Sequence, residues 1–254
     1  MPAGDSISLV LSRRIPLDSR PRRRGRIELL PKTYLFRYPT GPAQGSEMID
    51  VKEIAQLHTK TVCDWHEVDI TNPYSGLLAV VCDQHSFNFQ LWHQEDIARS
   101  PVADDHVIAD VKRKIDKLNQ QRNDWIEKVD DFLTRMLQER DVQTDVEKPI
   151  NTETPGSVID RLSILSLRIF HMQEQLDRED ADVDHRMKVA AKLELCKIQQ
   201  VELSDALQKL LVDIANGNIR HRTYRQMKMY NDPSLNPAIY QHDAPATSGL
   251  RRAA

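Results

Sequence analysis

The chain is organised around the stretch Glu153-Thr154-Pro155-Gly156-Ser157-Val158-Ile159-Asp160-Arg161-Leu162-Ser163-Ile164-Leu165-Ser166-Leu167-Arg168-Ile169-Phe170-His171-Met172. Thr154 can cap a helix with its hydroxyl, and Pro155 then occupies the first helical position, where its missing N–H costs nothing. From Val158 to Met172, apolar side chains lie on nearly every side of such a helix. A helix that is apolar all round is buried all round. The stretch therefore predicts the central helix of a helical bundle.

The composition is typical of a soluble protein made of long helices. Hydrophobic residues make up 40% and charged residues 29% of the 254 residues, with only 8 glycines and 6% aromatic residues. The cysteines at positions 63, 82 and 196 are odd in number and lack the spacing of metal ligands, so neither a disulfide framework nor a zinc site is indicated. Because no apolar run has membrane-spanning length and the N-terminus lacks the apolar core of a signal peptide, we expect a cytoplasmic protein without a membrane span.

Charge is segregated along the chain although the net charge is only -3. Residues 1–46 carry 9 Lys and Arg against 3 Asp and Glu, residues 220–254 carry 6 against 2, and the acidic middle carries 20 against 33. The Pro- and Arg-rich start cannot bury itself. We expect residues 1–47 to be a disordered tail or an over-extended gene start, and residues 242–254 to be disordered. The N-terminal tail is the one segment where nucleic acid could bind.

Between these ends the sequence predicts a single all-α domain over residues 48–241. Apolar residues of the third helical segment recur at helical spacing, for example at Ile108, Ile115 and Ile126. An Asn216-Gly217 pair supplies a helix-terminating residue near the end of the domain. The prediction is a bundle of about five long helices around the buried central one, with no sheet. The expected helices are 48–65, 77–99, 105–139, 155–178 and 185–215.

Polar residues recur at core-facing positions on three of these helices. A buried polar group without a partner costs on the order of 1–3 kcal/mol, so the pattern predicts either a shared buried network or a ligand site. The binding candidates are Asn88 and Trp92 on the second helix, Asn119 and Arg122 on the third, and Asp160, Arg161 and His171 on the central helix. The candidates for acid–base catalysis are His93, Glu95 and Asp96.

Each candidate also has a structural interpretation. A carboxylate can pair with Arg122 or Arg161 merely to fix the helix register, and His93 and His171 can be satisfied core histidines. In the basic segment after residue 220, Arg225 and Lys228 could bind phosphate, or they could form salt bridges to the acidic body. Both interpretations remain open from the residues alone.

No metal site is predicted, and the sequence indicates no cofactor. Helical di-metal sites use Glu-x-x-His pairs on two helices, and here only Asp182-x-x-His185 approximates that pattern, in a predicted loop. The segments Trp65-His66-Glu67 and Trp92-His93-Gln94-Glu95 echo each other. Two matches this short are expected by chance.

Four segments together resemble a known family. They are Asn88-Phe89-Gln90-Leu91-Trp92-His93-Gln94-Glu95-Asp96-Ile97-Ala98-Arg99, Asn119-Gln120-Gln121-Arg122-Asn123, residues 151–167, and Tyr224-Arg225-Gln226-Met227-Lys228-Met229-Tyr230-Asn231. They resemble the bacterial family DUF4254, a domain of unknown function, and the resemblance covers about residues 48–241 in order. It implies a helical, cytoplasmic protein whose genes often lie among cell-envelope polysaccharide genes. The resemblance thus implies a genomic context but no particular reaction.

Two functions therefore stay open. The first is a small-molecule binding protein or enzyme for a phosphorylated or sugar-nucleotide ligand of cell-envelope polysaccharide metabolism. Arg122 and Arg161 would hold the phosphate by bidentate hydrogen bonds, and Glu95 or Asp96 would be the acid or base. The alternative is a non-enzymatic helical interaction module, a homo-oligomer, in which the polar cluster is structural. A pocket lined by these residues favours the first, whereas a dry, fully paired network with a large exposed apolar face favours the second.

Overall fold

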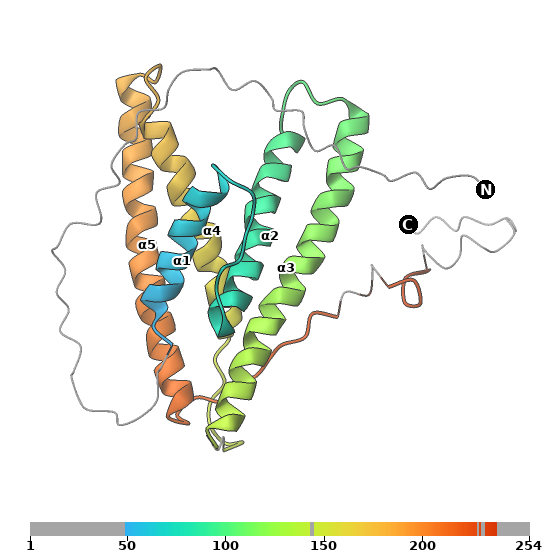
Figure 1. Cartoon of the computed structure of the whole chain (residues 1–254), viewed down its shortest axis with the longest axis vertical. Coiled ribbons are helices and arrows are strands. Elements are labelled where there is room, and N and C mark those ends of the chain that lie inside the picture. The colour runs from blue at the N-terminus through green and yellow to red at the C-terminus, as the bar shows by residue number, and fades with distance from the viewer. Residues whose placement is uncertain (1–48, 143–144, 228, 230–231, 238–254) are drawn as a thin grey trace, which may run out of the picture. The chain divides into compact units, whose positions relative to one another are not determined.

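The computed structural model describes residues 49–142, 145–227, 229 and 232–237, which belong to one compact unit that begins at residue 47. The tails expected at residues 1–47 and 242–254 lie outside the described residues, as does Lys228. The described part of the chain forms five α helices. Its only bridge between extended segments joins Ile150 and Arg220, so the predicted all-α fold is confirmed. The helices are α1 (Val51–Trp65), α2 (Gly76–Ala98), α3 (Asp105–Glu139), α4 (Pro155–Leu176) and α5 (Val183–Ala215) (Figure 1).

Side-chain caps explain where most of these helices begin. Asp50, Asp104, Thr154 and Asp182 each accept a hydrogen bond from a backbone N–H in the first turn of α1, α3, α4 and α5, which satisfies a donor that the helix itself cannot pair. The cap at Asp182 starts α5 two residues earlier than expected. Its carboxylate accepts from the backbone N–H of His185 at 2.7 Å, so the Asp182-x-x-His185 pair is a helix cap.

The predicted central helix is α4, which packs against each of the other four helices (Figure 1). Its first half is buried from Val158 to Leu167, except for the exposed Arg161 and the half-buried Ile164. From Arg168 onward its side chains are exposed or only partly buried. Burial on all sides, expected along the whole helix, therefore holds only for the first half.

The start of α4 lies against α3 because residue 156 has no side chain. A Cβ atom at Gly156 would stand 2.6 Å from the carbonyl oxygen of Ile126 and 2.9 Å from Oδ1 of Asp130. The backbone N–H of Gly156 instead donates to Asp130 Oδ1 at 2.8 Å. A glycine and a buried carboxylate thus fix where the central helix enters the bundle.

The main apolar core is built from all five helices, and α3 contributes Val129 and Leu133 to it. Its most deeply buried members include Ile54, Val81, Ile159, Leu162 and Leu207, and each buried side chain of this size contributes about 1.5–3 kcal/mol. A smaller cluster of Leu91, Val111 and Ile115 joins α2 to α3. Among the described helices, none has the length and apolar character needed to cross a membrane.

Candidate functional site

The carboxylate of Asp160 lies at the centre of a buried polar network. Asp160 is only 4% exposed. Its Oδ1 accepts hydrogen bonds from Gln84 Nε2 at 2.6 Å, from Asn88 Nδ2 at 2.9 Å and from Arg122 Nε at 2.7 Å. Its Oδ2 accepts from Arg122 Nη2. The network thus joins α2, α3 and α4 through one carboxylate, and the guanidinium of Arg122 binds it in a bidentate manner.

A hydroxyl one turn further along α4 extends the network. Ser163 Oγ accepts from Asn88 Nδ2 at 2.8 Å and bonds to His85 Nδ1 at 2.6 Å. Residues 85 and 88 lie on one face of α2, and residues 160 and 163 on one face of α4, because residues three apart are neighbours on a helix. Helical spacing alone therefore presents both sets of polar groups to each other.

Charge is balanced within this network. Its ions are the carboxylate of Asp160 and the guanidinium of Arg122, and the hydrogen bonds that Arg122 donates to Asp160 raise the pKa of Arg122 above its usual range. Two histidines lie next to it, His58 and His85, with ring centroids 4.6 Å apart. Burial lowers the pKa of His58 to about 3 and also lowers that of His85. Both rings are therefore neutral at pH 7.

Several predicted site residues lie elsewhere and bond to other partners. Glu95 pairs with Arg99 at 2.6 Å, and Arg161 pairs with Glu153 at 2.6 Å, both near the surface. Arg225 pairs with Glu127 and Asp131 of α3, Asp96 is exposed, and Asn119 is half-buried. The single site expected from the sequence is thus divided: Asn88, Arg122 and Asp160 come together, whereas Glu95, Arg161 and Arg225 are held apart from them.

His93, His171 and Trp92 belong to a second cluster, which also contains His66. Trp92 stacks on His171 with centroids 4.8 Å apart and planes 9° apart. Ring nitrogens of His66, His93 and His171 all lie within 4.8 Å of one another, the one such group found among the described residues. His66 was not a candidate from the sequence. The echo of Trp-His in Trp65-His66 and Trp92-His93 was the only signal for it, and the structure brings both histidines together.

Burial and neighbouring rings keep His93 of this cluster uncharged at pH 7. Burial, followed by the neighbouring His66 and His171, lowers the pKa of His93 below its usual value, with Asp96 and Glu174 acting weakly in the opposite sense. His93 is accordingly neutral at pH 7. A neutral imidazole can accept a hydrogen bond or coordinate a metal through its unprotonated nitrogen.

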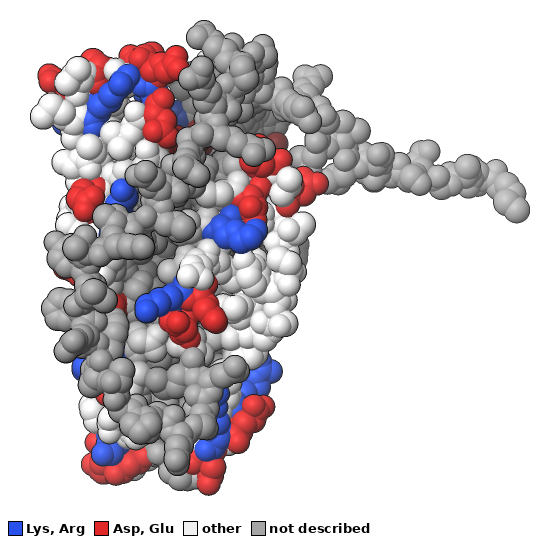
Figure 2. All heavy atoms as spheres, turned by 60° about the vertical axis from the view of Figure 1, so that its left-hand side comes forward, with Lys and Arg blue, Asp and Glu red and all other residues white. Residues whose placement is uncertain are grey.

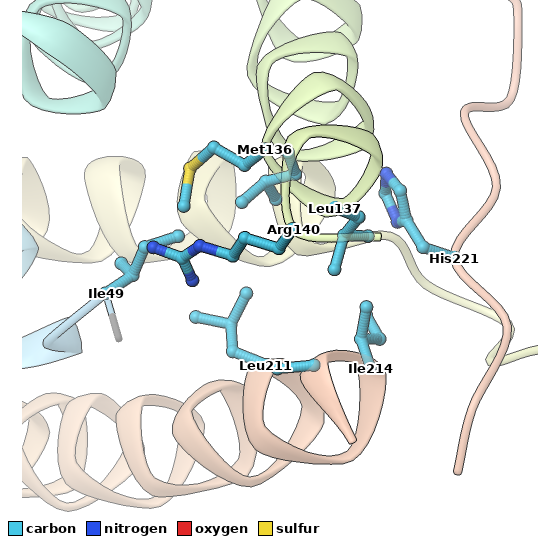
Figure 3. A pocket seen from close by; sticks show the side chains of 9 residues that line it. Ile49, Met136, Leu137, Arg140, Leu211, Ile214 and His221 are labelled. Atoms are coloured by element: carbon cyan, nitrogen blue, oxygen red, sulfur yellow. The ribbon is translucent and has the colours of Figure 1, made fainter. Parts of the chain in front are cut away.

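One small cavity lies between the C-terminal ends of α3 and α5 (Figure 3). Its volume is about 30 Å³, which is room for roughly one water molecule. Ile49, Met136, Leu211 and Ile214 give it apolar walls, and the side chain of Arg140 extends across it. It contains no residue predicted for a site and is too small for a metabolite.

A larger groove of about 480 Å³ runs between α4 and α5. Arg161, Ile164, Leu165 and Arg168 line its α4 side, and Gln199, Glu202, Leu203 and Ala206 line its α5 side. This volume lies within the roughly 300–1,000 Å³ of small-molecule sites. On the face seen in Figure 2, acidic and basic side chains of the described residues lie beside one another rather than in separate patches. The pair Arg161 and Arg168 therefore indicates an anion-binding site more specifically than the mixed charge of this face does.

A family model described as "Protein of unknown function (DUF4254)" matches residues 78–223. The chain belongs to the DUF4254 family. The resemblance seen in the sequence is thereby confirmed, although the matched span is shorter than the one expected. The span contains the polar network, both sides of the α4–α5 groove, His93 and His171; α1 and His66 precede it. No match was found among curated proteins or among solved structures.

In this DUF4254 protein the buried network and the groove have different chemical capacities. Both oxygens of Asp160 accept from the guanidinium of Arg122, and Oδ1 also accepts from Gln84 and Asn88 of α2. A ligand at that point would have to displace a buried carboxylate from its cation, which is costly. The groove, in contrast, presents Arg161 and Arg168 on an exposed surface beside apolar side chains.

Proposed function

We propose that this DUF4254 protein binds a phosphorylated small molecule in the groove between α4 and α5. The observation that carries the proposal is the pair Arg161 and Arg168 on one side of a groove of metabolite size. The proposed site therefore does not include Arg122, which the sequence indicates as a phosphate-binding residue. Arg161 keeps the role expected from the sequence.

The spacing of the two arginines suits an extended anion. Residues seven apart are two helical turns apart, about 10 Å along the axis of α4. Both side chains are on nearly the same face, since seven residues nearly complete two turns. Each guanidinium offers a planar fork that matches phosphate oxygens in a bidentate manner. Two phosphate groups, or a phosphate and a second acidic group, would satisfy both arginines.

The rest of the groove supports a ligand with a sugar and an apolar face. Ile164, Leu203 and Ala206 offer apolar contacts, whereas Gln199 and Glu202 offer oxygens that can accept from hydroxyl groups. The gene neighbourhood implied by the resemblance, cell-envelope polysaccharide synthesis, makes sugar nucleotides and sugar phosphates the class to test first. Three free cysteines suit a reducing compartment, and a cytoplasmic location is part of the proposal.

The proposal is for binding and assigns no reaction. The acid–base candidates His93, Glu95 and Asp96 all lie on α2, and Glu95 is bonded to Arg99. The groove is lined by α4 and α5. No group predicted for acid–base work therefore lines the proposed site.

Binding can be measured by calorimetry and thermal shift on the full chain with UDP-glucose, glucose 1-phosphate, glucose and inorganic phosphate. We expect UDP-glucose or glucose 1-phosphate to bind, glucose not to bind, and Arg168→Ala to weaken binding by about tenfold or more, the loss of one charge-assisted contact. Glu153→Gln should strengthen binding, because it releases Arg161 from its ion pair. The matched control is Arg113→Ala, which removes an exposed arginine of α3. Equal affinity in Arg168→Ala and the wild type would contradict the proposal.

A second candidate function, self-association, is favoured by one specific surface. Met187, Leu195, Ile198 and Val201 of α5 are between 47% and 68% exposed, and their spacing puts them on one side of the helix. Exposed apolar faces of this kind mark interaction sites. Light scattering should then report an oligomer that Leu195→Glu with Ile198→Glu dissociates, whereas Val102→Glu, at an exposed apolar residue outside α5, leaves it intact.

A further inference from the structure

We propose that His66, His93 and His171 form a binding site for a divalent transition metal ion such as Zn²⁺. This inference goes beyond the phosphate-binding groove and does not depend on it. The sequence indicates no metal site, because the Glu-x-x-His spacing of helical di-metal sites is absent from it. Three single histidines from separate elements leave no such spacing in a sequence.

The three rings come from different parts of the fold and converge on one point. His66 is the C-terminal cap of α1, His93 lies in the second half of α2, and His171 lies in the second half of α4. The ring centroids are 5.2 Å apart for His66 and His93, 5.2 Å for His66 and His171, and 5.8 Å for His93 and His171. One nitrogen from each ring lies within 4.8 Å of the other two.

Hydrogen bonds at the outer side of two rings select the tautomer that a metal requires. His66 Nδ1 is 2.6 Å from the carbonyl oxygen of Val62, and His171 Nδ1 is 2.8 Å from Glu174 Oε2. Carbonyl and carboxylate oxygens only accept, so Nδ1 carries the proton in both rings. The lone pair is then on Nε2 in each. Metal-binding histidines are usually held in this way, with the other ring nitrogen donating to a backbone carbonyl or a carboxylate.

The Nε2 atom of His171 adds an independent observation. It is buried and has no hydrogen-bond partner among the described residues. A buried polar atom without a partner is unfavourable, and a coordinated cation would satisfy it.

Aromatic side chains hold the rings in place from outside. Phe170 stacks on His66 with centroids 4.2 Å apart, Trp92 stacks on His171, and Phe89 meets the ring of His93 edge-on at 4.5 Å. These aromatic neighbours limit how far each imidazole ring can rotate. Three nitrogens bound to one tetrahedral Zn²⁺ at about 2.0–2.1 Å stand roughly 3.4 Å apart, so a small contraction would complete the site.

The donor set indicates the class of metal. Three imidazoles without a thiolate suit Zn²⁺, Ni²⁺, Cu²⁺ or Fe²⁺ better than Mg²⁺ or Ca²⁺, which prefer oxygen. Three protein ligands around Zn²⁺ leave a fourth position, as in sites that keep a water or a ligand oxygen.

The test uses the full chain freed of metal by a chelator, with Zn²⁺ titrated against a chromophoric competitor and no phosphorylated ligand present. We expect one Zn²⁺ per chain and a higher melting temperature with Zn²⁺. His93→Leu should weaken binding by about 100-fold or more, and Glu174→Gln, which replaces the carboxylate acceptor of His171 Nδ1 with a neutral amide, by about 10–100-fold. Co²⁺ should give visible absorption bands of a tetrahedral site in the wild type, and His93→Leu should abolish them.

Two controls make the result specific. His106→Gln removes an exposed histidine at the start of α3 and should leave the affinity unchanged, as should Arg168→Ala in the groove. Circular dichroism of the metal-free variants verifies that they are folded, and Glu174→Gln, at a partly exposed residue, keeps the test available if His93→Leu does not fold. The proposal is overturned if the wild type takes up no Zn²⁺. It is also overturned if Glu174→Gln and, where it folds, His93→Leu bind Zn²⁺ as tightly as the wild type.

Discussion

Arg122 of α3 and Asp160 of α4 meet in a bidentate ion pair, and the same carboxylate also accepts from Gln84 and Asn88 of α2. One carboxylate thus holds three helices in register at a point that is almost fully buried. Pairing of this kind is neutral or weakly favourable for stability while it is intact, but removing one partner leaves an uncompensated charge in the interior. The fold should therefore be sensitive to the loss of either partner of this pair.

We predict that Arg122→Ala destabilises the protein by about 3 kcal/mol, because Asp160 keeps its amide donors but loses its cation. Urea unfolding followed by circular dichroism measures the change. Arg161→Ala, at an exposed residue of α4, should lower the free energy of unfolding by less than about 1 kcal/mol. The double change Arg122→Met with Asp160→Leu should recover part of the loss, since it leaves no buried charge but deprives the amides of Gln84 and Asn88 of an acceptor. A cost for Arg122→Ala as small as that for Arg161→Ala would show that water reaches Asp160.

The sequence predicts the fold because residues that start or end a helix can be recognised locally. Pro155 after Thr154 starts α4, and Asn216-Gly217 follows the end of α5. Helix boundaries differ from the predicted ones by a few residues where a capping residue resembles a loop in the sequence, as at Asp182. Burial of α4 is also less complete than its apolar pattern predicts, since apolar side chains beyond Arg168 lie at a partly exposed end of the helix.

The candidate sites followed less well, because a sequence gives the face of a helix and not the partner of that face. Arg122, Asn88 and Asp160 were expected to meet, and they do. Glu95 and Arg161 border the same faces, yet each bonds to a nearby opposite charge at the surface. His66 could not be placed, because its position depends on where α1 ends relative to α2 and α4, which is set by tertiary packing.

Gly156→Ala should destabilise the protein by about 1–3 kcal/mol through overpacking. The added Cβ would meet the carbonyl oxygen of Ile126 and the carboxylate of Asp130, and a backbone atom inside α3 cannot move aside cheaply. Thermal unfolding measures the effect. The matched control is Gly76→Ala, where no atom lies within 4 Å but φ is +59°, so that only backbone strain of about 1 kcal/mol is expected. An equal or smaller loss at Gly156 would mean that α4 can shift away from α3.

Stability should fall with acid, and His58 should account for part of the slope. The pKa of His58 is lowered from 6.5 to about 3 by burial. Between these values the unfolded chain binds a proton that the folded chain excludes, so the free energy of unfolding decreases by up to about 1.4 kcal/mol per pH unit as pH falls. Above pH 6.5 both states are neutral and the contribution vanishes.

The change His58→Leu isolates that contribution. Neither ring nitrogen of His58 has a hydrogen-bond partner among the described residues, so an apolar side chain should leave the protein at least as stable at pH 7. The loss of stability between pH 7 and pH 5, measured by urea unfolding, should be smaller in the variant. His85, whose pKa is also lowered, keeps a residual slope. Parallel pH profiles of variant and wild type would contradict the assignment.

The segment after α5 is fastened to α3 by Arg225. This segment passes along α3 in Figure 1, where Arg225 bonds to Asp131 at 2.7 Å and to Glu127 at 3.0 Å. These hydrogen bonds raise the pKa of Arg225, and the bond from Arg225 lowers the pKa of Asp131. Thr223 also bonds to Asp131, and the backbone N–H of Gln226 to Glu127. The basic segment is thus held by salt bridges to the acidic body.

Asp131→Asn should loosen this segment while changing global stability by less than about 1 kcal/mol, because the ion pair is exposed. Trypsin cleavage after Arg220 and Arg222, followed by mass spectrometry, should become several-fold faster. High salt should accelerate cleavage in the wild type and much less in the variant, since salt screens an attraction that the variant has already weakened. Asp110→Asn is the matched control, because it removes an exposed partner of Arg113 elsewhere on α3. If Asp131→Asn and Asp110→Asn are cleaved at the wild-type rate, the segment is held by its backbone contacts, such as that of Arg220 with Pro149, rather than by charge.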